Sequence, residues 1–97
     1  GDSIVGENCN FGAGTQVANY KFDASTVRMK VGETLHDTEK KKLGVLIGDS
    51  VKTGVLACMM PGKSIGDGCW VGAGVVVNKD IPRNTKVFVK QELEYLR

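Results

Sequence analysis

The sequence predicts an all-β chain wound as a parallel β-helix, and two observations carry this prediction. The stretch 47–82 divides into six consecutive hexads, which begin at Ile47, Thr53, Met59, Ile65, Val71 and Val77. A Gly follows the first residue in four hexads, and the two exceptions, Met60 and Asn78, lie eighteen residues apart. Neither an α-helix nor ordinary strand alternation accounts for a six-residue period. We therefore expect three hexads to form one triangular coil, with residues eighteen apart stacked on one another.

The fifth positions of these hexads predict a thin aliphatic core. They are small or aliphatic in five cases of six: Val51, Ala57, Lys63, Cys69, Val75 and Ile81. The stacking rule places Ile47 on Ile65, Val51 on Cys69, and Asp49 on Asp67. Thirteen Gly and few aromatic residues suit a coil of narrow cross-section with tight turns.

Length, charge and cysteine content limit the possible classes. Ninety-seven residues support one domain, and a net charge of +2 gives no case for nucleic acid as a partner. The cysteines Cys9, Cys58 and Cys69 are odd in number and lack metal-binding spacing, so we expect reduced thiols in a cytoplasmic protein. No apolar run reaches the length of a membrane span, and we predict no membrane association.

The chain divides into four parts. Residues 1–22 follow the same hexad rule and predict a first coil, whereas residues 23–46 break it and predict an inserted arm. Within the arm, Val27–Val31 alternates as a half-exposed strand before Gly32 and suggests a hairpin at a corner of the coil. Two coils follow at 47–82. We expect residues 83–97 to form a tail that caps the last coil, because an open coil end needs a cover.

Several motifs resemble a known family. They are Asn10–Thr15 (Asn-Phe-Gly-Ala-Gly-Thr), the pair Asn19-Tyr20, Ile47–Gly54 and Val71–Ile81. Together they resemble the C-terminal left-handed β-helix of bifunctional glucosamine-1-phosphate acetyltransferases / N-acetylglucosamine-1-phosphate uridylyltransferases. The insertion is most similar to that of the archaeal sugar-1-phosphate nucleotidylyltransferases. Hexads alone are shared by many proteins, whereas the Gly-Ala-Gly run followed by Asn-Tyr is more specific.

This resemblance implies an acetyl transfer from acetyl-CoA to the amine of an amino-sugar 1-phosphate, on the route to UDP-N-acetylhexosamine. Such a reaction needs a base for the amine, donors for the oxyanion, and aligned substrates. In the family a His supplies the base from a segment upstream of the one that matches Gly1. The resemblance therefore implies an N-terminal nucleotidylyltransferase domain and a catalytic segment that are absent from this chain. We expect the 97 residues to turn over little by themselves.

The resemblance also assigns residues to the sugar side. Asn19 matches the family residue that orients the base and the amine, although an Asn at a turn can serve hydrogen bonding alone. Asn10 matches a sugar-phosphate contact, and Tyr20, which follows Asn19 in the motif, is a second candidate for substrate binding or for packing. The family has a Lys where this chain has Ser25, so Lys21, Arg28 or Lys30 is expected to supply the charge.

For the cofactor, the family runs its pantetheine along small residues and backbone amides. The matching positions here are Ala13, Val55 and Ala73, and Val55 replaces a Ser of the bacterial enzymes. Basic residues that meet the CoA phosphates match Lys79 and Lys90. The alternative is that Gly-Ala-Gly is only a turn and that both lysines are solvated.

Three readings of the function remain. The first is the acetyltransferase domain, assembled as a homotrimer with CoA in the cleft between two coils. The second is a non-catalytic β-helix that trimerises and regulates an attached nucleotidylyltransferase, and the third is an acyltransferase of another hexapeptide subfamily. His36, the one His, is expected to be an exposed residue of the arm, and one His cannot build a zinc site.

Overall fold

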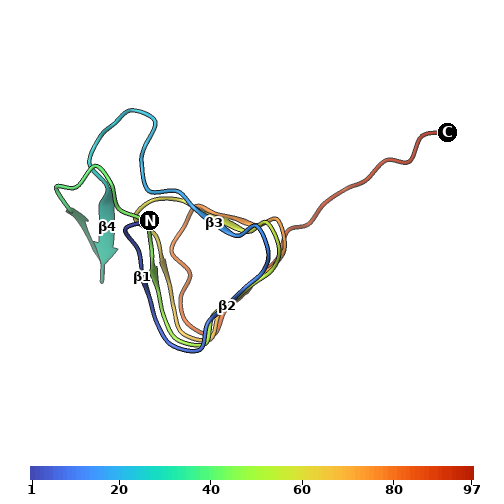
Figure 1. Cartoon of the computed structure of the whole chain (residues 1–97), viewed down its shortest axis with the longest axis horizontal. Coiled ribbons are helices and arrows are strands. Elements are labelled where there is room, and N and C mark those ends of the chain that lie inside the picture. The colour runs from blue at the N-terminus through green and yellow to red at the C-terminus, as the bar shows by residue number, and fades with distance from the viewer.

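The computed structural model describes all residues, 1–97, and shows a β-helix of triangular cross-section (Figure 1). Each coil contributes one two-residue strand to each of three faces. Sheet A contains β1 (Ile4–Val5), β6 (Leu46–Ile47) and β9 (Ser64–Ile65). Sheet B contains β2 (Asn10–Phe11), β7 (Lys52–Thr53), β10 (Trp70–Val71) and β12 (Lys86–Val87). Sheet C contains β3 (Gln16–Val17), β8 (Cys58–Met59) and β11 (Val76–Val77).

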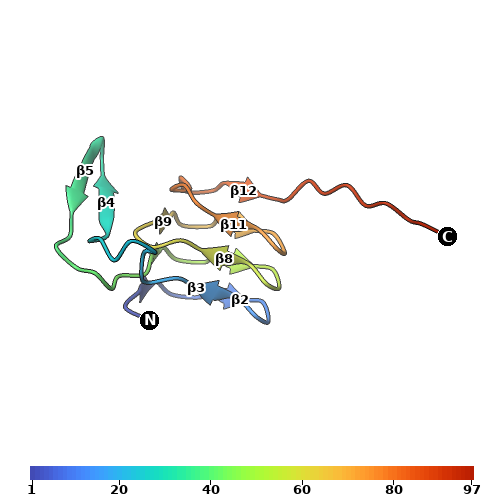
Figure 2. The ribbon, with the colours of Figure 1, turned by 90° about the horizontal axis from the view of Figure 1, so that it is seen from above.

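All strand pairs between coils are parallel, and their register confirms the stacking rule. Ile47 pairs with Ile65, and Thr53 with Val71, each eighteen residues further along the chain. The coils lie one above another (Figure 2), and the fold is a left-handed parallel β-helix, as predicted.

The core follows the hexad rule closely. The first and fifth residues of each hexad point inward, and the buried cluster contains Val45, Ile47, Val51, Ala57, Met59, Ile65, Cys69, Val71, Val75, Val77 and Ile81. Lys63 is the one fifth position of this stretch outside the cluster. Its side chain lines a pocket below the arm, while Val45 fills the corresponding inward position one coil earlier. At Lys63, therefore, a position that is inward in the other hexads belongs to the surface of a pocket.

Glycine follows the first hexad residue because neighbouring coils approach closely there. A Cβ on Gly54 would lie 2.5 Å from the backbone nitrogen of Ala73, and one on Gly12 would lie 2.5 Å from the carbonyl carbon of Gly54. Any side chain at these positions would push two coils apart, which explains why Gly occupies the second position of the hexad.

The predicted arm is a hairpin of β4 (Arg28–Val31) and β5 (Thr34–Asp37), paired antiparallel. Val27 fastens its base: the residue is fully buried, its N–H donates to the Lys40 carbonyl, and its own carbonyl accepts the Thr38 N–H. The hairpin stands beside the coil at the corner between sheets C and A (Figure 2).

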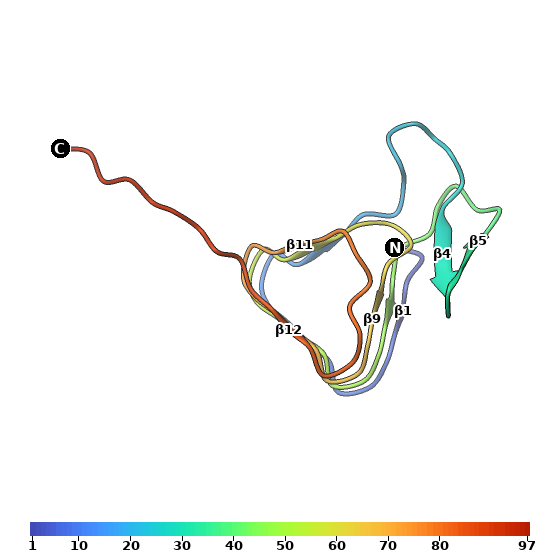
Figure 3. The same ribbon diagram turned by 180° about the vertical axis from the view of Figure 1, so that it is seen from behind.

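The C-terminal segment differs from the prediction. Residues 81–87 form a partial turn whose strand β12 pairs with β10 and covers part of the last coil. Residues 89–97 do not cap it; they are exposed and run away from the coil (Figure 3). The open edges of sheets A and B are already paired with Ile81 and with β12 of the partial turn. The tail therefore finds no free strand edge there to pair with.

Candidate functional site

The three residues expected along the cofactor form one column at the corner between sheets B and C. The N–H of Leu56 donates to the Ala13 carbonyl at 2.9 Å, and that of Gly74 donates to the Val55 carbonyl at 2.9 Å. Ala13, Val55 and Ala73 are all exposed, one from each coil. The corner therefore presents a ridge of small side chains and backbone that an extended ligand can follow.

A shallow hollow of about 440 Å³ adjoins this ridge on the outer face of sheet B. It brings Asn10 and Ala73 together, two residues that the sequence assigned to different ligands. Its rim also holds Phe88, from the segment after β12. Substrate and cofactor candidates thus share one face of the coil.

Trp70 lies at the centre of this face, between two lysines. The Nζ atom of Lys86 lies 4.0 Å from the ring centroid, and that of Lys52 lies 5.8 Å from it. Both distances are within the range of a cation–π interaction. The first residue of each strand points outward, so Asn10, Lys52, Trp70 and Lys86 form one outward column.

Asn19 lies after β3, away from the sheet B hollow. Its side-chain amide donates to Asp2 at 3.1 Å, and its carbonyl accepts the N–H of Leu43 at 2.9 Å. The residue therefore sits where the first coil opens into the arm and where the arm returns. A substrate at Asn19 would compete with Asp2 for the amide.

Tyr20 lines a second pocket, of about 520 Å³, at the base of the arm. The pocket is lined by Ala18, Tyr20, Lys21, Phe22, Arg28, Leu35, Met60, Pro61 and Lys63. It holds three cations and no carboxylate. Two of the three residues expected to replace the missing family Lys, Lys21 and Arg28, lie here, whereas Lys30 is not part of the lining.

The predicted phosphate-binding lysines lie apart from each other. Lys79 borders a hollow of about 310 Å³ at the open end of the coil, with Asp80 beside it. Lys90 belongs to the projecting tail. Within one chain neither residue joins the hollow that contains Ala73.

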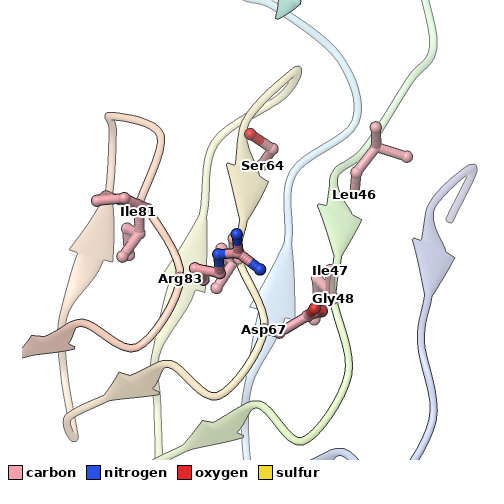
Figure 4. A pocket seen from close by; sticks show the side chains of 10 residues that line it. Leu46, Ile47, Gly48, Ser64, Asp67, Ile81 and Arg83 are labelled. Carbon is pink, nitrogen blue, oxygen red and sulfur yellow. The ribbon is translucent and has the colours of Figure 1, made fainter. Parts of the chain in front are cut away.

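A further hollow lies on sheet A, and Figure 4 shows side chains along it. Arg83 and Asp67 are its charged residues, and Leu46 and Ser64 belong to neighbouring strands of the same sheet. None of the expected site residues lies there.

Two carboxyl groups of the arm have shifted pKa values. Hydrogen bonds from the side chain and backbone of Ser25 lower the pKa of Asp23. The N–H of Glu39 and the Thr26 side chain lower the pKa of Asp37, and the nearby charges of Arg28 and Lys21 act in the same direction. These carboxylates hold turns of the arm rather than a site.

His36 is exposed and pairs with Met29 across the hairpin, as expected for an arm residue. No group of three or more His, Cys, Asp and Glu side chains is arranged to hold a metal ion. The chain also contains no helix that is long and apolar enough to cross a membrane.

Sequence reasoning missed Lys52, Trp70, Lys86 and Phe88 on the sheet B face. The outward position of Lys52 and Trp70 follows from the hexads, since each precedes a first hexad residue. Lys86 could not be placed in this way, because the last turn is shorter and pairs Lys86 with Trp70 sixteen residues earlier.

Comparison with known proteins agrees with the geometry. A family model described as a hexapeptide repeat of succinyl-transferase matches residues 3–17 and 44–79, just over half of the chain. The two matched ranges omit the arm and the tail, the parts that depart from the coil in the structure.

Two curated relatives are similar over most of the chain. The chain is 45% identical over 93 residues to the bifunctional protein GlmU of Methanocaldococcus jannaschii, which covers 96% of the chain and 22% of that protein. It is 41% identical over 81 residues to the bifunctional sugar-1-phosphate nucleotidylyltransferase/acetyltransferase of Sulfurisphaera tokodaii, covering 84% of the chain and 20% of that protein. The chain thus spans about a fifth of the length of these relatives.

A solved structure supports the fold. Serine acetyltransferase isoform 3 of Entamoeba histolytica, in complex with cysteine, aligns with a TM-score of 0.73 over 99% of this chain and 28% of its own. Its sequence is 18% identical, so the likeness concerns the coil and not the ligand.

Proposed function

Because the chain belongs to the hexapeptide-repeat family, we propose that it forms the acetyltransferase domain of a bifunctional sugar nucleotide enzyme. In this role it transfers an acetyl group from acetyl-CoA to the amine of an amino-sugar 1-phosphate. The relatives that match it over 84% to 96% of its length carry both activities or the bifunctional description in their names.

The observation that carries the proposal is the column Ala13, Val55 and Ala73 with Asn10 in the adjoining hollow. The column leaves backbone and small side chains exposed along a line that crosses all three coils. A pantetheine arm is thin and extended, so it fits such a ridge better than a deep cavity. An acceptor at Asn10 would then lie beside the thioester end.

Asn19 is proposed to orient the base and the acceptor amine, and Tyr20 to contact the substrate from the arm base. His36 is exposed on the arm and is not the base in this proposal. The base comes from a part of the longer enzyme outside these 97 residues, together with the nucleotidylyltransferase domain. Proton removal from the amine is what that base contributes.

The separation of Lys79 and Lys90 from the column fits a site completed by another copy. In the proposed cytoplasmic homotrimer, a neighbouring coil brings basic residues to the CoA phosphates that follow the ridge of Ala13 and Ala73. This arrangement also explains why each chain alone presents an open hollow rather than an enclosed pocket.

A binding experiment on this chain tests the cofactor part. Titration with CoA, followed by two-dimensional NMR, should shift the amides of Ala13, Val55 and Ala73. Ala73→Gln should weaken binding at least about tenfold by filling the ridge, while Val76→Gln, on sheet C of the same coil, should leave it unchanged. Shifts confined to the arm, or equal binding by both variants, would overturn the assignment.

A second experiment uses the longer enzyme and separates catalysis from scaffolding. Asn19→Ala should lower acetylation of glucosamine 1-phosphate by orders of magnitude and leave nucleotidyl transfer intact, whereas Asn78→Ala, an exposed Asn of the last coil, should change neither. Equal activity of Asn19→Ala in both reactions would make Asn19 a structural residue and favour the non-catalytic reading.

A further inference from the structure

The arm and the residue that precedes it, Phe22, leave large apolar side chains exposed. Phe22 is fully exposed, and Val31 and Leu35 keep 65% and 59% of their surface exposed. An isolated hairpin is marginally stable in water unless a third strand or another element covers one face. We therefore expect these exposed apolar side chains to pack against another segment.

The pocket below the arm combines this apolar surface with positive charge. Tyr20 and Met60 contribute apolar walls, and Lys21, Arg28 and Lys63 are its charged residues. Asp37 lies opposite Arg28 in the hairpin register, and the charge of Lys21 acts on Asp23 and Asp37. Neither carboxylate lines the pocket, whose charged residues are all cations. The matching ligand is an acidic segment with apolar side chains.

The C-terminal tail has this chemistry. Leu93, Tyr95 and Leu96 are exposed, the last two by more than 80%, and Glu92 and Glu94 lie among them. In an extended segment, side chains alternate between two sides, so Leu93 and Tyr95 share one side and the two Glu residues share the other. The tail can therefore present apolar and acidic sides at once.

The tail leaves its own coil on the side opposite the arm (Figures 1 and 3). Fully extended, residues 89–97 reach about 30 Å from the coil. Docking on its own arm would require the segment to reverse its direction and cross sheet C. In the direction that it takes, the tail meets no part of its own chain, so a second copy has access to it there (Figure 1).

We propose that residues 92–96 of one copy dock as an extended segment in the arm pocket of a second copy. Leu93 and Tyr95 pack against Met60 and Leu35, beside the Tyr20 that the proposed function assigns to the substrate, while Glu92 and Glu94 face Lys21 and Lys63. The proposal concerns assembly and does not depend on acetyl transfer.

Charge reversal tests the docking in this chain. Glu92→Lys with Glu94→Lys should raise the concentration of half-association in sedimentation at least about tenfold, and so should Lys21→Glu with Lys63→Glu. Glu7→Lys with Glu33→Lys, at two exposed positions outside the tail and the pocket, is the matched control and should leave association unchanged. Circular dichroism checks that every variant keeps the coil.

Mixing the two reversed variants distinguishes docking between copies from docking within one. A reversed tail fits a reversed pocket, so the mixture should recover part of the association that each variant alone has lost if the tail crosses to a neighbour. Recovery is partial because a trimer of two variants keeps at least one contact between like copies. Failure of the mixture to recover, or association that is unaffected by either double reversal, would overturn the proposal.

Hydrogen exchange provides a measurement independent of charge. The amides of β5 (Thr34–Asp37) and of residues 92–96 should exchange more slowly as concentration rises, and deletion of residues 89–97 should remove this protection from β5. Protection of β5 that persists after the deletion would show that the tail is not its cover.

Discussion

The Asp67 carboxylate accepts the backbone N–H of Asp49 at 2.7 Å, and the Asp49 carboxylate accepts that of Glu7 at 2.7 Å. Each acidic side chain thus connects its coil to the preceding one at the same corner. A hydrogen bond with an ionised acceptor is stronger than a neutral one. The stacking that the eighteen-residue period predicts is therefore fixed by side chains as well as by strands.

This ladder of aspartate hydrogen bonds between coils, from Asp67 to Asp49 and from Asp49 to Glu7, predicts unequal effects for two substitutions at Asp67. Asp67→Ala should lower the free energy of unfolding by about 1–2 kcal/mol, because it leaves the Asp49 N–H without its acceptor. Asp67→Asn should cost less, since an amide oxygen can accept the same hydrogen bond. Urea unfolding measures both, and an equal loss in the two variants would contradict the ladder.

The close approach of the coils predicts a cost at Gly54. A Cβ in Gly54→Ala would meet backbone atoms of Ala73, so we expect a loss of roughly 1–3 kcal/mol in thermal or urea unfolding. Gly32→Asn is the control: its surroundings are open, and Asn tolerates the positive φ of 61°. A Gly54→Ala variant as stable as the control would mean that the coils separate without cost.

The single Trp predicts a difference between its two lysine neighbours. Lys86→Met should destabilise the chain by about 0.5–1 kcal/mol, whereas Lys52→Met, whose ammonium lies further from the ring, should have the smaller effect. Because Trp70 is the only Trp, its fluorescence reports both changes directly. Equal effects of the two variants would argue against the cation–π contact with Lys86.

The lowered pKa of Asp37 predicts that the base of the arm depends on pH. A carboxyl group whose pKa is lower in the folded state stabilises that state above its unfolded pKa, near pH 4, and loses this contribution as pH falls through the folded pKa. Acidification should therefore release the Glu39 N–H, which donates to Asp37 at 2.8 Å. NMR titration of the Asp37 carboxyl carbon measures the shift, and Asp37→Asn should remove this contribution to the pH dependence and leave that of Asp23.

Much of the fold could be predicted because the hexad pattern determines which residues point inward and where the coils approach each other. Ile47 and Val51 point inward since the first and fifth positions of each hexad must, and the Gly at the second position marks the close approach between coils. The hairpin was predictable from its alternation and from Gly32. The C-terminal segment was not, because the repeat ends near Pro82 and no period relates Lys86 or Tyr95 to the coil.

The candidate site was predictable only in part. The column Ala13, Val55 and Ala73 follows from the stacking rule, and its residues do lie above one another. The pocket around Tyr20 depends instead on how the arm folds back beside Lys63, and no local pattern encodes that contact. The roles proposed for Asn10 and Asn19 remain predictions until CoA binding and acetyl transfer are measured.

The arm also has a consequence for the order of folding. Leu46 pairs with Ser64 across eighteen residues, whereas Ile4 pairs with Leu46 across forty-two, because the arm interrupts the chain between the first two coils. The longer loop raises the entropic cost of closure by about 0.8 kcal/mol. We expect the second and third coils to form the nucleus and the first coil to join last, so that destabilising changes near Ile4 accelerate unfolding and leave the folding rate almost unaltered.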